Sequence, residues 1–549
     1  MANPNWRQLF LRIMIIVAAG FWIYSPILNG TWLWDDDIDI LFNPLLKNVA
    51  GLQTIWLDPA HLSAYYPITF TLEWIEWHLW GANTTGYHFV TLLFHILNGL
   101  LIWRLLSKLG LRLAWLGGLL FVVHPMNVES ASWMVELKNT LSLTPFLLAM
   151  GAWIDFEDQR RTRDYWTSWV LFLVAMLCKT TAMMFPFVIL LYAWWKHGRL
   201  GWKEIKFSLP FFPISFVLCV ATTWLQHQHS TLTSDIPLGG ALSRIACSGL
   251  TLSYYFSKFF LPLGLMPIQP QWKINPPTLP EFLPWLVVAF AFCWFWIKRA
   301  SWGKHALLGF GFFLINLLPV LGFKLFSYMG FTWVFDHFLY IPMIGLIGLT
   351  IAAVEHLESL LPASRRPYVM ATAVAALVLL MLQAHAYASI FLDQEKLWTY
   401  ELKYNDMAWP AHDNLGNVFF AEGANDEAEG KADEKNGRLD EAKRKFDESR
   451  HEFDEANAHY KRSLAINPYR FEVHNNLGLV LSLRGHYAEA IEQYNECLSI
   501  KSDYALAYVN MGDTFTKMGR IQDAKHQYEQ ALKIDPDNGA ARDGLSKLQ

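Results

Sequence analysis

Charged residues are scarce in this sequence, and cysteines are few. Only 17% of the 549 residues are Asp, Glu, Lys or Arg, whereas about 25% is usual for a soluble domain. The net charge of −4 leaves no basic excess, so the composition gives no sign of nucleic-acid binding. The five cysteines show neither metal-ligand spacing nor an obvious disulfide pairing. These deficits argue against a soluble nucleic-acid-binding protein and against a scaffold held by disulfides or zinc.

Apolar residues are abundant instead, and they are unevenly distributed. The chain is 53% hydrophobic and contains 26 Trp. Residues 1–390 are apolar with short charged interruptions, and residues 391–549 are polar and charged. This division predicts an all-α protein, with a polytopic membrane domain at 1–390 followed by a soluble domain at 391–549.

Eleven long apolar runs are predicted to span a membrane as helices. They cover 8–28, 87–106, 113–124, 139–155, 166–179, 183–196, 207–225, 282–298, 305–323, 338–355 and 367–390. The first run follows Arg7 and Arg12 and precedes no small-residue cleavage site, so we expect a retained signal anchor. The run 240–262 contains Arg244 and Lys258 and is interpreted as an interfacial or re-entrant segment.

The Lys and Arg residues predict which loops face the cytoplasm, because cytoplasmic loops carry the positive excess. With 240–262 not crossing, the basic loops alternate consistently. This places the N-terminus in the cytoplasm and the C-terminal domain on the periplasmic, or extracytoplasmic, side of the inner (cytoplasmic) membrane. A consequence is that many polar residues gather at the outer face: Asp35 to Asp39, His124, Glu129, Lys138, Lys179, Arg244, Lys258, Asp336 and His337.

An acidic motif, WDDDIDILFNP at 34–44, directly follows the first apolar run. A carboxylate at the hydrocarbon boundary is costly unless it is solvated, paired or used, so it is a candidate functional residue. A solvated Asp-rich turn is the alternative. The motif alone does not choose among Asp35, Asp36, Asp37 and Asp39.

Two further segments of the predicted outer face are rich in polar groups. The loop 124–139, HPMNVESASWMVELKN, places His124, Glu129, Glu136 and Lys138 beside the membrane. Any one of them is more often a structural hydrogen-bonding group, but the cluster favours a site. The aromatic-rich segment 68–80 is too short to span and is expected to be an interfacial helix.

The last part of the chain repeats with a period of 34 residues, the tetratricopeptide period. About three repeats and a short final helix at 538–549 are predicted. In the first repeat, a charged insertion at about 421–453 moves the second helix about 28 residues further along the sequence than in the other repeats. This insertion is interpreted as extended helix or partly disordered chain. The concave face of such a stack binds extended peptides or partner proteins; a dimerisation or spacer module is the alternative.

These motifs, in this order, resemble the transmembrane-and-tetratricopeptide O-mannosyltransferases and their bacterial relatives, within the GT-C superfamily. The resemblance is carried by WDDDIDILFNP, HPMNVESASWMVELKN, CKTTAMMFP (178–186), LSRIACSGLTLSYYFSKFFLP (242–262), VFDHFLYIPMIGL (334–346) and the repeats. The chain departs from the bacterial pattern at Leu137, where Arg is usual, and at His337-Phe338, where Arg-Tyr is usual.

The resemblance implies a membrane glycosyltransferase that uses a polyprenyl-phosphate-linked sugar, mannose or another hexose, as donor. The acceptor would be a Ser or Thr hydroxyl of a protein on the outer face, and the repeats would bind the acceptor or a partner protein. A carboxylate must take the proton of the attacking hydroxyl, and a single displacement inverts the anomeric carbon. Asp35 and Asp36 match the acidic pair of the family's first outer loop, and Asp36 is slightly preferred as base. Glu129 would orient the substrate or assist.

Cations are needed to hold the donor phosphate. Lys179, Arg244 and Lys258 are the first candidates, with Lys138 and His337 as further ones, and His124 and Asp336 are expected to support the site. A divalent metal held by Asp35 and Asp36 is an open alternative. Two other functions also remain open: transfer to a lipid or surface glycan by the same fold, and a non-catalytic membrane-anchored repeat scaffold.

Overall fold

The computed structural model describes residues 6–229, 236, 238–323 and 326–548, and this part of the chain is helical without strands. The predicted all-α class is confirmed. The chain forms two compact units, Met1–Asp393 and Gln394–Gln549.

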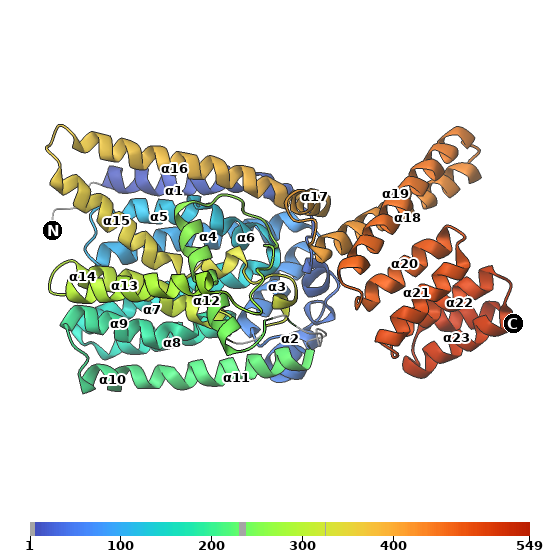
Figure 1. The fold of residues 1–549 in the computed structure, drawn as a ribbon, viewed down its shortest axis with the longest axis horizontal. Coiled ribbons are helices and arrows are strands. Elements are labelled where there is room, and N and C mark those ends of the chain that lie inside the picture. Colours follow the sequence, from blue (N-terminus) through green and yellow to red (C-terminus); the bar gives the residue numbers. More distant parts are fainter. Residues whose placement is uncertain (1–5, 230–235, 237, 324–325, 549) are drawn as a thin grey trace. The chain divides into compact units, whose positions relative to one another are not determined.

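Most helices of the first unit run along one common direction (Figure 1). They are α1 (Trp6–Tyr24), α4 (Thr84–Lys108), α5 (Ala114–Val123), α7 (Leu137–Gln159), α8 (Thr162–Cys178), α9 (Phe185–His197), α10 (Trp202–Ser208), α11 (Phe212–His229), α13 (Leu283–Ile297), α14 (Gly303–Leu317), α15 (Met343–Leu360) and α16 (Arg366–Ala388). Each predicted span falls on one of these helices. Seven helical stretches of the described chain are long and apolar enough to cross a membrane, so the number of spans, eleven, stays a prediction.

Helix α12 (Ala241–Phe260), the segment that was predicted not to cross, differs from its neighbours. It runs across the direction of α13 and α14 (Figure 1). It is also absent from the seven stretches that qualify as spans. Both observations agree with an interfacial or re-entrant segment, because two charged residues within twenty make a full crossing costly.

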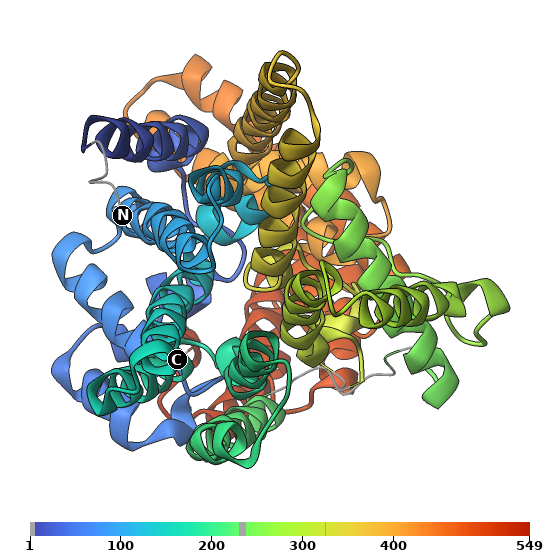
Figure 2. The same cartoon turned by 90° about the vertical axis from the view of Figure 1, so that its left-hand side faces the viewer.

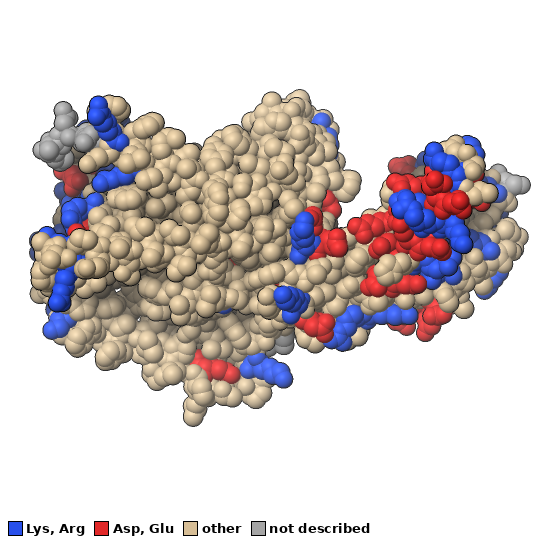
Figure 3. All heavy atoms as spheres, turned by 90° about the horizontal axis from the view of Figure 1, so that it is seen from above, with Lys and Arg blue, Asp and Glu red and all other residues tan. Residues whose placement is uncertain are grey.

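The charges of the first unit lie mainly at its ends. Its flank is almost free of charged side chains, and Lys and Arg gather at the end that carries the N-terminus (Figure 3). The α4–α5, α7–α8, α9–α10, α13–α14 and α15–α16 connections reach this basic end. We call the opposite end the acidic end, because Asp35, Asp36 and Glu129 lie in its loops. This asymmetry is the pattern expected of a membrane protein with its basic end in the cytoplasm.

The predicted interfacial helix at 68–80 is α3 (Pro67–Trp80), which follows α2 (Val49–Leu57). Its acids do not face water: Glu73 is 3% exposed and Glu76 is 1% exposed. Its exposed face instead carries Ile75 and Leu79. The helix is thus turned with carboxylates inward and apolar side chains outward, which suits contact with lipid.

The second unit begins with α17 (Gln394–Tyr404) and continues as three helical hairpins and a final helix. The hairpins are α18 (Trp409–Lys435) with α19 (Leu439–Ile466), α20 (Phe471–Leu483) with α21 (Tyr487–Ile500) and α22 (Ala505–Lys517) with α23 (Ile521–Ile534); α24 (Gly539–Lys547) is last. The segment 421–453 forms the outer halves of α18 and α19 with their connection. The alternative of partial disorder for this insertion is therefore wrong.

Three glycines explain how the inserted segment packs. Gly416, Gly423 and Gly430 recur every seven residues on α18, and each faces an aromatic ring of α19 that also recurs every seven residues: Tyr460, Phe453 and Phe446. The shorter hairpins use the same contact once each, Gly478 against Tyr494 and Gly512 against Tyr528. The 28 extra residues therefore add two heptads to α18 and two to α19. Each added heptad repeats the glycine-to-aromatic contact that the shorter hairpins make once.

We expect Gly423→Leu to open this long hairpin. A Cβ at Gly423 would lie 3.0 Å from Cδ1 of Phe453, and overpacking of this kind costs about 1–3 kcal/mol of stability. Limited proteolysis of the full chain should cut within 421–453 sooner in the variant than in the wild type. Ala428→Leu, on the exposed face of the same helix, should leave the cleavage rate unchanged; equal protection in both variants would contradict the packing.

Candidate functional site

Four loop segments meet at the acidic end of the first unit. They are the segment after α1, with a π-helical turn at Asp37–Leu41; the segment between α5 and α7, which contains α6 (Val128–Ser132); the turn Thr180–Met184 between α8 and α9; and the turn Asp336–Leu339 before α15. Loops and short turns such as these bring backbone groups and polar side chains to the end of a bundle of apolar helices. The predicted site residues fall mostly in these loops.

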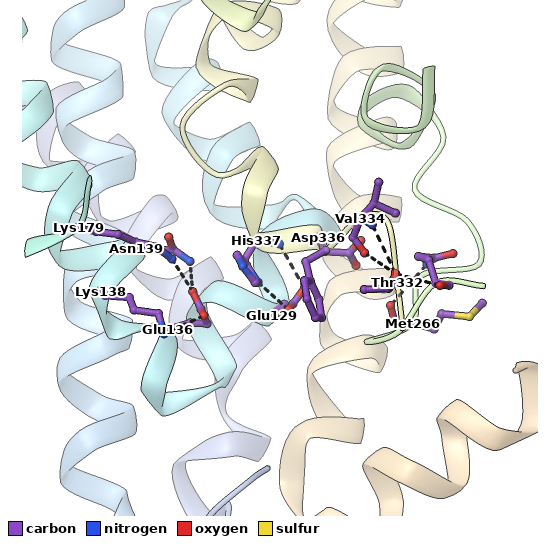
Figure 4. Close-up of polar contacts among 12 residues, drawn as sticks. Glu129, Glu136, Lys138, Asn139, Lys179, Met266, Thr332, Val334, Asp336 and His337 are labelled. Atoms are coloured by element: carbon purple, nitrogen blue, oxygen red, sulfur yellow. Dashed lines mark hydrogen bonds and ion pairs between the residues drawn. The ribbon is translucent and has the colours of Figure 1, made fainter. Parts of the chain in front are cut away.

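Glu136 lies at the centre of one buried polar cluster (Figure 4). Its carboxylate is 3.2 Å from Nζ of Lys179 and 3.3 Å from Nζ of Lys138, and it also accepts a hydrogen bond from Asn139. Burial alone would raise the pKa of Glu136, but the charges of His337, Lys138 and Lys179 outweigh it and hold that pKa well below its usual range. Two lysines with one shared carboxylate leave a net positive charge, which suits a bound anion.

Glu129 and His337 form a second contact beside this cluster. Nδ1 of His337 is 2.8 Å from Oε1 of Glu129, and the backbone N–H of His337 donates to Oε2 at 3.2 Å. Both side chains are buried. Glu129 therefore fixes the ring of His337 in one orientation, and its two oxygens are both in use.

Asp336 directly precedes His337 and links two helices to the site. Tyr254 of α12 donates to Oδ1 at 2.7 Å, and Tyr387 of α16 donates to Oδ2 at 3.4 Å. Burial and the nearby charge of Glu129 raise the pKa of Asp336 to about 8. Asp336 thus supports the turn that carries His337.

Asp36 is a clamp between the first and second outer loops. It is fully buried, and its two oxygens accept backbone N–H groups of Leu33 and Val135, each at 2.9 Å. A carboxylate that accepts two backbone amides holds its loops in place but offers no free oxygen in this geometry.

Asp35 is placed differently. Its Oδ1 is buried, and within the described chain it has no hydrogen-bond partner. Burial and the charge of Asp39 raise the pKa of Asp35 to about 8, against the opposing effect of Lys138. Trp34, directly before it, has a positive φ of 49° and stacks on Trp133 at 5.2 Å. A non-glycine residue in this conformation is strained, and the stack holds the backbone that directs Asp35.

We expect Asp36→Asn to act on stability. The amide keeps one acceptor oxygen but turns an NH₂ group toward a backbone N–H, so one buried donor loses its partner at a cost of about 1–3 kcal/mol. A thermal unfolding measurement on the full chain should show a lower midpoint for this variant than for Asp35→Asn, whose changed oxygen has no partner to lose. The opposite order would show that Asp36 is not the clamp.

The remaining predicted residues lie in other contacts. Arg244 donates to the carbonyl of Phe323 at 3.2 Å, and Lys258 donates to the carbonyls of Leu263 and Gly264. Lys258 is near enough to lower the pKa of Asp336, but no contact among the described residues brings Arg244 to the Glu136 cluster. His124 bonds through Nε2 to the carbonyl of Phe259 at 2.9 Å and stacks on its ring, so it ties the second loop to α12.

Several residues of the site were not singled out from the sequence. Glu136 was noted only as one acid of its loop, and Asn139, Tyr254 and Tyr387 not at all. The spacing Glu136-x-Lys138 beside a predicted membrane end was the available signal for the first. The two tyrosines lie in otherwise apolar runs, where an aromatic residue is ordinary, so the sequence carried no signal for them.

The acids do not fit a metal site in this arrangement. Among the residues that the structure describes, no three His, Cys, Asp or Glu side chains lie close enough together to hold a metal ion. The pair proposed as ligands, Asp35 and Asp36, has only Asp35 with an uncommitted oxygen. The geometry therefore gives the metal alternative no support.

Comparison with known proteins reports on both parts of the chain. A family model described as dolichyl-phosphate-mannose-protein mannosyltransferase matches residues 66–225, and tetratricopeptide-repeat models match 459–492, 480–519 and 505–538. A solved tetratricopeptide domain, the first of Spaghetti (RPAP3) bound to an HSP90 peptide, aligns at 21% identity over 24% of this chain and 91% of its own, with a TM-score of 0.17. A score this low adds nothing to the repeat assignment.

Three curated relatives are protein O-mannosyl-transferases. F38B6.6 of Caenorhabditis elegans is 26% identical over 25% of this chain, TMTC3 of Mus musculus is 29% identical over 33%, and TMTC4 of Homo sapiens is 27% identical over 32%. The matched region spans only 22%, 20% and 27% of those relatives. The family model, the repeats and these relatives agree with the resemblance seen in the motifs: over part of its length the chain is similar to protein O-mannosyl-transferases, and its C-terminal part contains tetratricopeptide repeats.

Proposed function

We propose that this protein is an integral-membrane glycosyltransferase that moves a hexose, mannose or another, from a polyprenyl phosphate to a Ser or Thr hydroxyl of a protein. The reaction takes place at the acidic end of the membrane unit, on the extracytoplasmic side of the cytoplasmic membrane. The observation that carries the proposal is the net-positive Lys138–Glu136–Lys179 cluster, whose Lys138 also acts to lower the pKa of Asp35, against the larger effect of burial. The names of the relatives support the reaction class.

The lysines supply the phosphate side of the site. Lys179 and Lys138 share Glu136, so one positive charge remains for the donor phosphate and stabilises it as a leaving group. Both residues border the bundle of apolar helices, where the polyprenyl tail is soluble. Lys258 and Arg244 contact loop carbonyls. They are therefore weaker candidates for binding the donor phosphate than Lys179 and Lys138.

Asp35 rather than Asp36 is the proposed base. Both oxygens of Asp36 accept backbone amides, whereas Oδ1 of Asp35 is uncommitted. The acceptor oxygen forms the new bond to the anomeric carbon while the bond from that carbon to the phosphate oxygen breaks and its electron pair leaves with the polyprenyl phosphate. Asp35 takes the hydroxyl proton, and the single displacement inverts the anomeric centre. Glu129 acts through His337, which it orients.

The direct test supplies purified full-length protein with a polyprenyl-phosphate hexose and Ser/Thr-containing polypeptides. Mass spectrometry should find the hexose on Ser or Thr of the polypeptide, and NMR of the glycopeptide should show inverted configuration at the anomeric carbon. Hexose that appears only on added lipid or glycan would show a different acceptor class. No transfer to any acceptor, with protein that remains folded, would favour the scaffold alternative.

A further inference from the structure

A cavity of about 140 Å³ lies inside the membrane unit, away from the proposed active site. It is bounded by α4, α7, α9, α14 and α15, whose basic ends face the viewer in Figure 2. Its lining is overwhelmingly apolar and includes Leu106, Met150, Val188, Phe312, Gly348 and Ala352. The cavity is part of neither the Glu136 cluster nor the Asp35 loop, and the proposed reaction does not use it.

Glycines on α14 and α15 leave the space open. The two helices cross where Gly309 meets Gly345: a Cβ on Gly345 would lie 2.1 Å from the carbonyl oxygen of Gly309. One turn further along α15, Gly348 also lines the cavity, and a Cβ there would meet only Cδ2 of Leu106, at 3.4 Å. Close helix contact at one point and a missing side chain at the next leave a void that none of the described residues fills.

Part of the cavity lining lies toward the basic end, in the last turns of α4 and α9 and the first turn of α14. The indole N–H of Trp195 donates to Nδ1 of His305 at 3.1 Å, which joins α9 to α14 at the rim. Lysines directly neighbour three of the lining residues: Lys108 precedes Leu109, Lys196 follows Trp195, and Lys304 precedes His305. Lys108 and Lys196 pair with Asp155 and Asp158, and the basic end as a whole carries an excess of Lys and Arg (Figure 3).

An apolar cavity of this kind stays dry and takes up an apolar ligand. A sugar or a phosphate would find almost no hydrogen-bonding group inside it. Three of its walls, α4, α14 and α15, belong to stretches long and apolar enough to cross a membrane, so lipid chains are the apolar molecules that surround it. The basic excess of this end attracts anionic headgroups. Lys108 and Lys196 contribute less to that attraction, because each pairs with an Asp.

We propose that this cavity takes up a segment of one acyl chain of an anionic phospholipid from the leaflet at the basic end, with the headgroup outside it at that end. The inference is independent of the glycosyltransferase proposal. The donor lipid is not the occupant, because its phosphate belongs at the other end. Lys138 lies in the first turn of α7, and Met150 lies twelve residues on along the same helix, which is roughly 18 Å at 1.5 Å per residue.

Native mass spectrometry of the full-length, delipidated protein tests the proposal with palmitoyl-oleoyl phosphatidylglycerol as the probe. We expect a saturable complex of one lipid per chain. Ala352→Phe and Gly348→Leu, which fill the cavity, should each weaken binding at least about tenfold. Ala353→Leu, an exposed neighbour on the same helix, should bind as the wild type does, and all three variants should unfold at wild-type temperature.

Two results would overturn the proposal. In the first, the phosphatidylglycerol complex forms equally well in Ala352→Phe and in the wild type. In the second, Ala352→Phe binds phosphatidylglycerol as the wild type does but no longer binds polyprenyl phosphate, which would assign the cavity to the donor tail. Phosphatidylcholine of the same chain length should bind several-fold more weakly; equal binding would remove the anionic headgroup from the proposal.

Discussion

Replacement of Asp35 by Asn should lower the rate of sugar transfer about 10²- to 10⁴-fold, the usual contribution of a general base. The amide has almost the same size, so the loop should keep its conformation while the group that accepts the proton is lost. Oδ1 of Asp35 has no hydrogen-bond partner within the described chain, so the fold loses little with it. Single-turnover transfer from a polyprenyl-phosphate hexose measures the effect on the chemical step.

Asp58→Asn is the matched control for this variant. Asp58 belongs to the same outer loop, but its side chain is 58% exposed and lies 3.3 Å from His61, so its transfer rate should stay at the wild-type value. Wild-type turnover by a folded Asp35→Asn protein would remove Asp35 from the reaction. A loss in Asp36→Asn alone, at unchanged stability, would return the role of base to Asp36.

The pH dependence gives an independent check on the same residue. Burial, and then the charge of Asp39, raise the pKa of Asp35 to about 8. A base works only when it is deprotonated, so the transfer rate should rise as the pH increases toward about 8. In the Asp35→Asn protein the residual rate should not show this rise.

Replacement of Lys179 by Gln should lower the transfer rate about 10²- to 10³-fold, the loss typical when one group that stabilises developing charge is removed. Glu136 keeps Lys138 as a partner, but the cluster then has no net positive charge for the phosphate. The decrease should appear in the rate with saturating donor, because the phosphate becomes more negative as the bond to the sugar breaks.

Lys179→Arg and the pair Lys179→Gln/Glu136→Gln separate charge from structure. Arg keeps the charge with a different shape, so it should retain more activity than Gln. The double variant restores the net positive charge, because Lys138 no longer has Glu136 to neutralise it, and it should be more active than Lys179→Gln. Equal inactivity of all three variants, with a lowered unfolding temperature, would mean that Lys179 acts only as a structural partner of Glu136.

The sequence by itself determined the class, the order of parts and the end of the membrane unit where the candidate polar residues gather. Apolar length and charge periodicity are local properties of the chain, so the helices that match the predicted spans, the three repeats and the gathering of acids beside the first apolar run could all be predicted. The long hairpin was also present in the sequence, as glycines and aromatics at intervals of seven residues, but their pairing depends on which helix faces which.

Only the tertiary structure decided what each polar residue does, because hydrogen-bond partners come from distant segments. Asp35 and Asp36 are neighbours with the same chemistry, and the amide of Val135, ninety-nine residues away, makes one a clamp and leaves the other uncommitted. Glu136 became central because Lys179 reaches it from another loop. The inward turn of Glu73 and the cavity beside Gly348 likewise depend on how helices pack, which no local pattern specifies.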